Sequence, residues 1–239
     1  FMGIKSGLNE AFIIGGAEKD ALIAESPKAV GIIKPYLGGK NVRRWVCDYP
    51  DQWMVYMPHG VATKGLEAVL DHLRPFQKQL EGRATEQAWY ELQQPQEKFT
   101  TAYAQPKIIF PDIANDLRFA FDTKGAFFSN TAYCVASSDL YLLAILNAKA
   151  VQHFYVHLSA QIRGGYLRFW TQYVEQIPVP PVSPSDRNAL VTLVERVLAA
   201  KRANSSSETS ALEREIDERV YRLYALTPEE IKLVEKSGK

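Results

Sequence analysis

The segment Ile177-Pro178-Val179-Pro180-Pro181 divides the chain into two parts with different patterning. Before it, apolar runs are only a few residues long and are interrupted by Gly or Pro, which favours short strands and turns with a few helices. After it, apolar positions recur at helical spacing across 186–202 and 208–224. We therefore predict an α+β fold, with a domain of mixed short strands over 1–182 and a C-terminal helical hairpin region over 183–239.

Turn and capping residues predict several individual elements. Asp122-Thr123-Lys124-Gly125 separates two apolar runs, 118–121 and 126–128, and indicates a hairpin turn. Ser137-Ser138-Asp139 offers an N-cap for a long helix whose apolar face extends to Leu158. Thr227-Pro228-Glu229-Glu230 is typical of a helix start and predicts a short last helix. Residues 81–104 are polar and aromatic and predict no definite element.

Composition excludes several classes of protein. Hydrophobic residues make up 46% of the 239 residues and 27 aromatic residues are spread along the chain, which excludes general disorder. No apolar run approaches roughly 18 residues, so we expect no membrane partner. Cys47 and Cys134 are the only cysteines, and we expect a reducing, cytoplasmic location. Phe1 precedes Met2, which suggests that the natural protein is longer.

The distribution of charge is more informative than the formal net charge of +1. Residues 28–44 contain five cations and no carboxylate, and residues 140–174 contain Lys149, Arg163 and Arg168, many aromatic residues and again no carboxylate. Cations that neutralise phosphates and rings that contact sugars and bases are what a nucleic-acid surface needs. The alternatives are a solvated face for the first stretch and a buried helix for much of the second.

The segment 161–169, Gln-Ile-Arg-Gly-Gly-Tyr-Leu-Arg-Phe, is the most unusual in the chain. Arg163 and Arg168 flank a glycine pair that allows the backbone to approach a ligand closely. Arginine can bridge phosphate oxygens or bind guanine with two hydrogen bonds. The alternative is a pair of arginines that cap helix carbonyls or pair with acids, but no acid is present in the local sequence.

Catalytic motifs are weak in comparison. Asp112 after Pro111, followed by Asp122 and Lys124, fits the loose PD-(D/E)xK spacing of metal-dependent nucleases, although a turn and a strand end explain these residues better. His153 and His157 lie one helical turn apart without a third metal ligand nearby. We find no GxGxxG, no P-loop and no Asn-Pro-Pro-aromatic tetrapeptide. We therefore expect neither a catalytic site nor a metal or cofactor in this chain.

Six segments in chain order carry a resemblance to a known family: Gly3–Phe12, Ile32–Leu37 with the following Arg43-Arg44-Trp45, Pro106–Ala114, Phe127–Tyr133, Gln161–Phe169 and Gln176–Pro180. Together they resemble the TaqI-like C-terminal specificity domain. This is the target-recognition part of DNA adenine methyltransferases and of fused restriction–modification enzymes. The resemblance covers nearly the whole chain, with Ser6 in place of the usual Thr and Ala225 in place of the usual Gly. The tail Glu215–Ile231, which contains Ala225, resembles the helix that closes many such proteins.

The resemblance implies sequence-specific recognition of double-stranded DNA by this chain. It places methyl transfer to adenine N6, and the S-adenosylmethionine that this needs, in a catalytic domain before residue 1 or in a partner; restriction cleavage would also lie elsewhere. Residue type and context suggest phosphate or base contacts for the cations, base readout for the two asparagines and stacking for the tyrosine. The candidates are Lys5, Asn9, Arg43, Arg44, Asn130, Arg163, Tyr166 and Arg168. The alternatives are a protein-interaction module and a metal nuclease that uses Asp112, Asp122 and Lys124.

Overall fold

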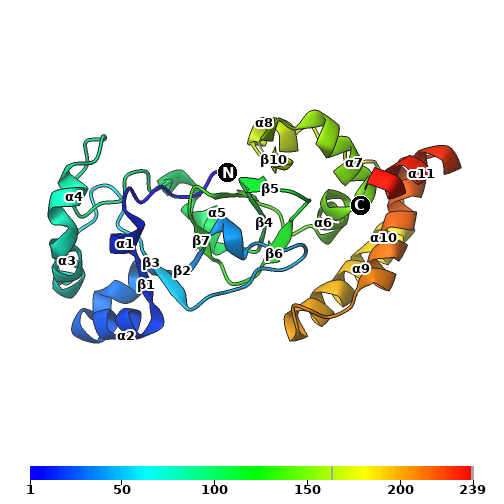
Figure 1. Ribbon diagram of the computed structural model, residues 1–239. Helices are drawn as coiled ribbons and strands as arrows, with labels where there is room; N and C mark the ends of the chain where they lie inside the picture. Colours follow the sequence, from blue (N-terminus) through cyan, green and yellow to red (C-terminus); the bar gives the residue numbers. More distant parts are fainter. Residues whose placement is uncertain (163, 238–239) are drawn as a thin grey trace. The chain divides into compact units, whose positions relative to one another are not determined.

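The computed structural model describes residues 1–162 and 164–237, and the chain forms two compact units (Figure 1). Unit 1 consists of residues 1–41, 49–107 and 123–136, and unit 2 consists of residues 42–48, 108–122 and 137–239. Helices combine with small sheets, so the predicted α+β class is confirmed. The expected functional division near residue 182 stays a prediction, and by its contacts the helical region belongs to unit 2.

A four-stranded sheet in the order β1-β3-β2-β7 organises unit 1. β3 is antiparallel to both β1 and β2, with Pro35 opposite Trp53, and β7 is parallel to β2, with Tyr36 opposite Phe127. Met54, Val55 and Leu37 are fully buried, which accounts for the apolar content of these short strands. The strands are β1 (Ile13–Gly15), β2 (Ile33–Leu37), β3 (Gln52–Val55) and β7 (Phe127–Phe128).

The other elements of unit 1 are mostly short helices, and several of them end one or two residues before a Gly or Pro. Pro75 lies in the 3-10 turn Arg74–Phe76, because proline lacks the N–H that a continuous α-helix needs. Unit 1 also contains α1 (Asn9–Phe12), α2 (Gly16–Glu25), α3 (Glu67–Leu73), α4 (Gln77–Glu81), α5 (Thr100–Ala104), β8 (Ala132–Val135) and 3-10 helices at Pro27–Gly31, Gly39–Asn41, Arg74–Phe76 and Glu97–Phe99.

Side-chain hydrogen bonds to the backbone hold the segment 81–104, for which the sequence predicts no element. The Arg83 guanidinium donates to the carbonyl oxygens of Leu80, Ser6, Glu91, Ala88 and Trp89 at 2.8 to 3.4 Å. The carboxylate of Glu91, a residue only 6% exposed, accepts from the N–H groups of Gly60 at 2.6 Å and Ala88 at 3.0 Å. These two side chains supply hydrogen bonds to the irregular part of the segment up to Glu91, whereas its end is helical, in the 3-10 helix Glu97–Phe99 and in α5.

Unit 2 combines two small sheets with the C-terminal helices. β10 pairs with β5 and with β9, and β6 lies beside β4. The strands are β4 (Lys107–Pro111), β5 (Ile113–Ala114), β6 (Ala120–Asp122), β9 (Gln161–Ile162) and β10 (Tyr166–Arg168); the first residue of β4, Lys107, is assigned to unit 1. The helices are α6 (Leu140–Asn147), α7 (Lys149–Leu158), α8 (Thr171–Val174), α9 (Pro184–Ala203), α10 (Ser210–Leu223) and α11 (Pro228–Ser237).

Two predicted elements are wrong in ways that have a physical cause. β6 and β7 do not form a hairpin, because β7 pairs with β2 in the four-stranded sheet. The long helix after Asp139 is interrupted at Ala148, whose ψ of 146° is extended. The buried Asn147 side chain binds both the N–H and the carbonyl of Phe119, which favours a helix end at this position.

The predicted C-terminal helices are confirmed. α9 packs on both α6 and α10, and its buried positions include Leu190, Val194 and Val197. Thr227 and Glu230 form a reciprocal cap at the start of α11, in which each side chain accepts from the other residue's N–H. Over residues 1–162 and 164–237, no helix combines the length and the apolar character needed to cross a bilayer.

Candidate nucleic-acid interface

The β9–β10 hairpin presents an exposed part of the predicted interface in unit 2. Leu167 pairs with Gln161, and Gly164 and Gly165 form the turn with φ of 89° and 78°, a conformation that favours glycine. On β10 the side chains alternate, so Leu167 is buried whereas Tyr166 is 44% exposed. Arg163 lies outside the described residues, and its predicted role stays a prediction.

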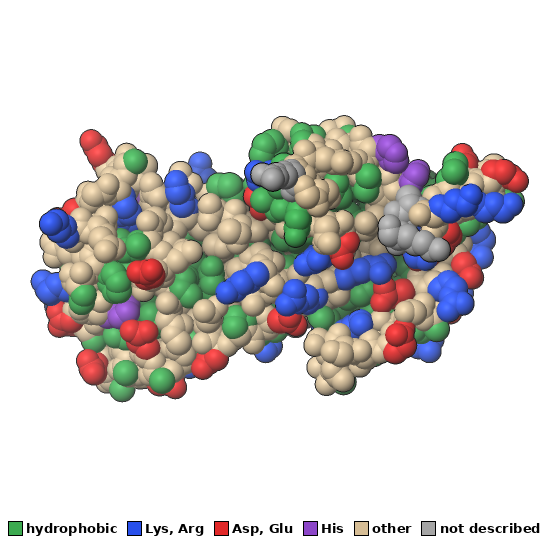
Figure 2. Space-filling view, in the orientation of Figure 1, with side chains coloured by type: hydrophobic (Ala, Val, Ile, Leu, Met, Phe, Trp, Pro, Cys, Tyr) green, Lys and Arg blue, Asp and Glu red, His purple; other side chains and the backbone are tan. Residues whose placement is uncertain are grey.

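Two further aromatic rings follow this hairpin. Trp170 is 39% exposed, and its ring stacks on that of Tyr173 with centroids 6.2 Å apart and 7° between the planes. The Arg168 guanidinium lies 5.2 Å from the centre of the Trp170 ring, within the range of a cation–π contact. Figure 2 shows hydrophobic side chains, in green, on the surface over α8 and β10. Accessible rings of this kind can stack on bases or contact sugars.

Arg168 has an acidic partner that the local sequence does not reveal. Its Nη1 donates to Oδ2 of Asp112 at 2.9 Å, and the two side chains are 28% and 21% exposed. The sequence leaves pairing with an acid open as the alternative, and this alternative holds for Arg168, because β10 pairs with β5 and this brings Asp112, 56 positions earlier, beside it. The ion pair fixes the direction of the guanidinium while part of it stays accessible. Whether Arg168 contacts DNA stays a prediction.

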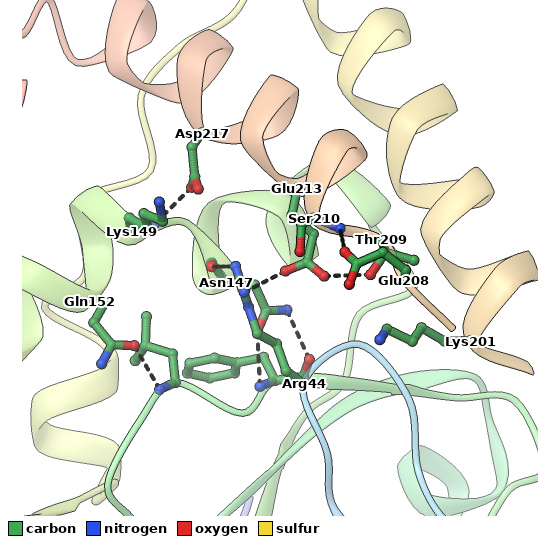
Figure 3. A network of polar contacts seen from close by, with 12 residues as sticks. Arg44, Asn147, Lys149, Gln152, Lys201, Glu208, Thr209, Ser210, Glu213 and Asp217 are labelled. Atoms are coloured by element: carbon green, nitrogen blue, oxygen red, sulfur yellow. Dashed lines mark hydrogen bonds and ion pairs between the residues drawn. The ribbon is translucent and has the colours of Figure 1, made fainter. Parts of the chain in front are cut away.

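Arg43 and Arg44 also pair with acids outside the carboxylate-free stretch. Nε of Arg43 donates to Asp48 at 2.6 Å. Arg44 forms an ion pair with Glu213 on α10 and donates to the carbonyl of Asn147 at 2.7 Å (Figure 3). The stretch 28–44 contains no carboxylate of its own, but the fold supplies one to each of these two arginines from outside it. Arg44 has a structural role within unit 2, and DNA contacts by either arginine stay predictions.

The same region contains a buried carboxylate that the sequence patterns miss. Asp217 is only 2% exposed, and its Oδ1 accepts from the backbone N–H of Lys149 at 2.9 Å, at the start of α7 (Figure 3). Burial raises the pKa of Asp217 to about 6, against the opposing influence of the Lys149 N–H, Arg44 and the Lys149 ammonium. The one feature of the sequence that could have indicated Asp217 is the position of an acid on the apolar face of an amphipathic helix.

The candidates in unit 1 are exposed and have fixed backbones. The backbone N–H of Lys5 donates to the carbonyl of Gln94, and the backbone N–H of Asn130 donates to the carbonyl of Ile4. Asn9 begins α1, and its Oδ1 accepts from the Ser6 hydroxyl at 2.7 Å. Lys5, Asn9 and Asn130 therefore present polar side chains on a rigid frame, and their DNA contacts stay predictions.

The alternative nuclease site gains no support from the geometry. Asp112 is paired with Arg168, Asp122 is fully buried, and the Lys124 ammonium lies 4.2 Å from the centre of the Tyr49 ring. His153 and His157 have ring centroids 4.9 Å apart. In the parts of the chain that the structure describes, no group of three or more His, Cys, Asp or Glu side chains could hold a metal ion.

Comparisons with known proteins agree on one kind of relative. Residues 34–179 match the model of the TaqI-like C-terminal specificity domain. The Type II methyltransferase M.BanIII of Aneurinibacillus aneurinilyticus is 24% identical over 141 residues, which is 54% of this chain and 24% of that protein. The Type II methyltransferase M.PaeR7I of Pseudomonas aeruginosa is 34% identical over 80 residues, 32% of this chain and 14% of that protein. The chain thus matches a quarter or less of each relative.

A solved structure gives the same result for the fold. It is that of the Type IIL restriction–modification enzyme MmeI in complex with DNA, which superposes with a TM-score of 0.67. The match covers 95% of this chain and 32% of that one, at 14% sequence identity.

Proposed function

Because the chain belongs to the TaqI-like C-terminal specificity domain family of restriction–modification methyltransferases, we propose that it recognises a specific sequence in double-stranded DNA. The methyl group would be transferred to adenine N6 by a catalytic domain in the same protein or in a partner, and that domain would bind S-adenosylmethionine. M.BanIII and M.PaeR7I are Type II methyltransferases, and the MmeI structure contains DNA, which supports this assignment.

The observation that carries the proposal is the exposed hairpin of β9 and β10 with its neighbouring rings. Gly164 and Gly165 have positive φ in the turn, Tyr166 is accessible, and Arg168 is held between Asp112 and Trp170. A guanidinium of fixed direction can select a phosphate or a guanine edge with little loss of side-chain entropy. The neighbouring rings supply contacts that do not depend on the base.

Duplex binding by the purified chain tests this proposal. Fluorescence anisotropy with a labelled duplex library should show an affinity that falls steeply as salt rises, because phosphate contacts release counterions. Tyr166→Ala and Trp170→Ala should each weaken binding by roughly tenfold, as expected for loss of one stacking contact. Phe154→Ala removes a ring that is 40% exposed on α7, and it serves as the matched control. No duplex binding at low salt would contradict the proposal.

The methyl-transfer part needs a separate measurement. With the catalytic domain supplied, digested DNA should contain N6-methyladenine by mass spectrometry, and the methylated adenines should lie within the sequence that this chain selects. Methylation of cytosine alone would contradict the adenine assignment and leave the DNA-recognition proposal intact.

An apolar groove favours a second candidate, an interaction module that docks a protein domain. The groove has a volume of about 580 Å³ and is formed by α7, α11 and the segment after α8. Phe154 and Leu233, both in its lining, are 40% and 58% exposed. Leu233→Ser should weaken association with a purified methyltransferase domain and leave duplex binding unchanged. An unchanged association would count against docking at this groove.

A further inference from the structure

Unit 1 contains a depression that is lined mainly by polar residues and by none of the residues of the β9–β10 hairpin. Its volume is about 460 Å³. It lies where β2 and β7 end and where β3 begins, with α1 on one border. Its lining includes Asn9, Glu10, Tyr36, Lys40, Gln52 and Thr131.

Several polar groups in this lining have no protein partner among the described residues. The hydroxyl of Ser6 donates to Oδ1 of Asn9, which leaves the two N–H groups of the Asn9 amide unpaired. The side chains of Glu10, Lys40 and Gln52 likewise form no hydrogen bond or ion pair with the described part of the chain. The depression therefore offers both donors and acceptors to a ligand.

The frame around these groups is rigid. The N–H of Gly39 donates to the Thr131 hydroxyl at 3.0 Å, and that hydroxyl lies 2.7 Å from the hydroxyl of Ser129. The Tyr36 ring is 8% exposed, and burial raises the pKa of its hydroxyl against a hydrogen bond with Ser129, so the hydroxyl stays neutral. A Cβ at Gly39 would lie 2.3 Å from the Thr131 carbonyl oxygen. Only glycine therefore fits this border.

We propose that this depression is a base-reading site that binds the edge of an adenine; this inference rests on the proposed function. An Asn or Gln amide can pair with adenine through its amino group and N7, and both Asn9 and Gln52 supply such an amide. The Glu10 carboxylate accepts from an exocyclic amino group and disfavours a phosphate at the same place. Lys40 at the rim supplies a cation for the adjoining phosphate.

The chain's sequence preference tests this site. Selection from a randomised duplex library, followed by sequencing of the bound fraction, gives the preference at each position. Asn9→Ala and Gln52→Ala should each reduce discrimination at one and the same adenine position by about tenfold, within the range of a bidentate base contact. The other positions should keep their preferences. Gln79→Ala removes an exposed amide of α4 that does not line the depression, and it serves as the control.

Three other outcomes of this selection would overturn the base-reading site. Asn9 and Gln52 variants that keep every preference overturn the base-reading site while the proposed function stands. A loss of affinity that is uniform over all sequences also overturns it, because it would indicate a phosphate contact or a general loss of structure. A natural chain that selects no sequence overturns the proposed function itself and this site with it.

Discussion

Replacement of the buried carboxylate by an amide, Asp217→Asn, should change how the stability of unit 2 depends on pH. Asp217 accepts from the N–H of Lys149 at 2.9 Å, and an amide oxygen can accept the same hydrogen bond. Asn therefore keeps the cap on α7 and removes the ionisable group. The perturbation isolates the cost of a buried negative charge.

The expected magnitude follows from the pKa of Asp217, which burial raises from 3.8 to about 6. A carboxyl that is harder to ionise in the folded chain than in the unfolded chain binds more protons when folded at intermediate pH. Its contribution to stability is fully present below about pH 4 and is lost as pH rises through about 6. At 1.36 kcal/mol per pKa unit, the loss amounts to about 3 kcal/mol.

Urea unfolding at a series of pH values from 4 to 8 provides the assay. The helical signal is suitable, because α9, α10 and α11 all belong to unit 2. The free energy of unfolding of Asp217→Asn minus that of the natural chain should rise by about 3 kcal/mol between pH 4 and pH 8. Other carboxyl groups affect both proteins alike and cancel in this difference.

Glu218→Gln is the matched control, since Glu218 is the next residue on α10 and is exposed. Its difference from the natural chain should be nearly independent of pH. If the Asp217→Asn difference were flat over the same range, the buried charge would not be the source of the pH dependence. A difference that falls with pH would show instead that Arg44 and Lys149 stabilise the ionised form more than burial destabilises it.

Three further predictions concern packing and the backbone. Arg83→Met should lower the free energy of unfolding by about 3 kcal/mol in a denaturant titration, because it leaves several carbonyl groups of 80–91 and that of Ser6 without hydrogen-bond donors. A loss below about 1 kcal/mol would contradict this. Gly39→Ala should lower the melting temperature by several degrees, since the added Cβ would lie 2.3 Å from a backbone oxygen. Gly38→Ala should leave the melting temperature almost unchanged, since no atom lies nearer than 3.5 Å to the added Cβ, and equal effects of the two substitutions would refute the steric argument. Asn147→Ala should cost about 2 kcal/mol by removing hydrogen bonds to Phe119, and hydrogen exchange should quicken at the Phe119 N–H; unchanged exchange there would count against it.

The parts of the fold that the sequence predicts well are those decided by nearby residues. The apolar positions of α9 and α10 repeat every three or four residues, and the reciprocal cap joins Thr227 to Glu230, three residues later. Asp139 likewise accepts from the N–H of Tyr141, as its position predicts. Each of these signals is local and needs no knowledge of a partner element.

The parts that the sequence misses depend on partners far along the chain. α6 ends at Asn147 because that side chain binds Phe119, and α7 begins at Lys149 under a cap from Asp217. The predicted hairpin fails because β7 pairs with β2, about 90 residues earlier, rather than with its neighbour. In the candidate site, Arg168 looks unpaired until strand pairing brings Asp112 to it.

The segmented make-up of unit 2 affects how related genes could exchange target preference by recombination. Arg44 comes from the segment 42–48, whereas its partners Asn147 and Glu213 come from 137–239. A crossover anywhere between these positions would join an arginine inherited from one parent to acceptors inherited from the other. Chimaeras that exchange the stretch from 42 to 213 as one block keep these partners together, and we expect such hybrids to yield more folded protein than hybrids cut inside it.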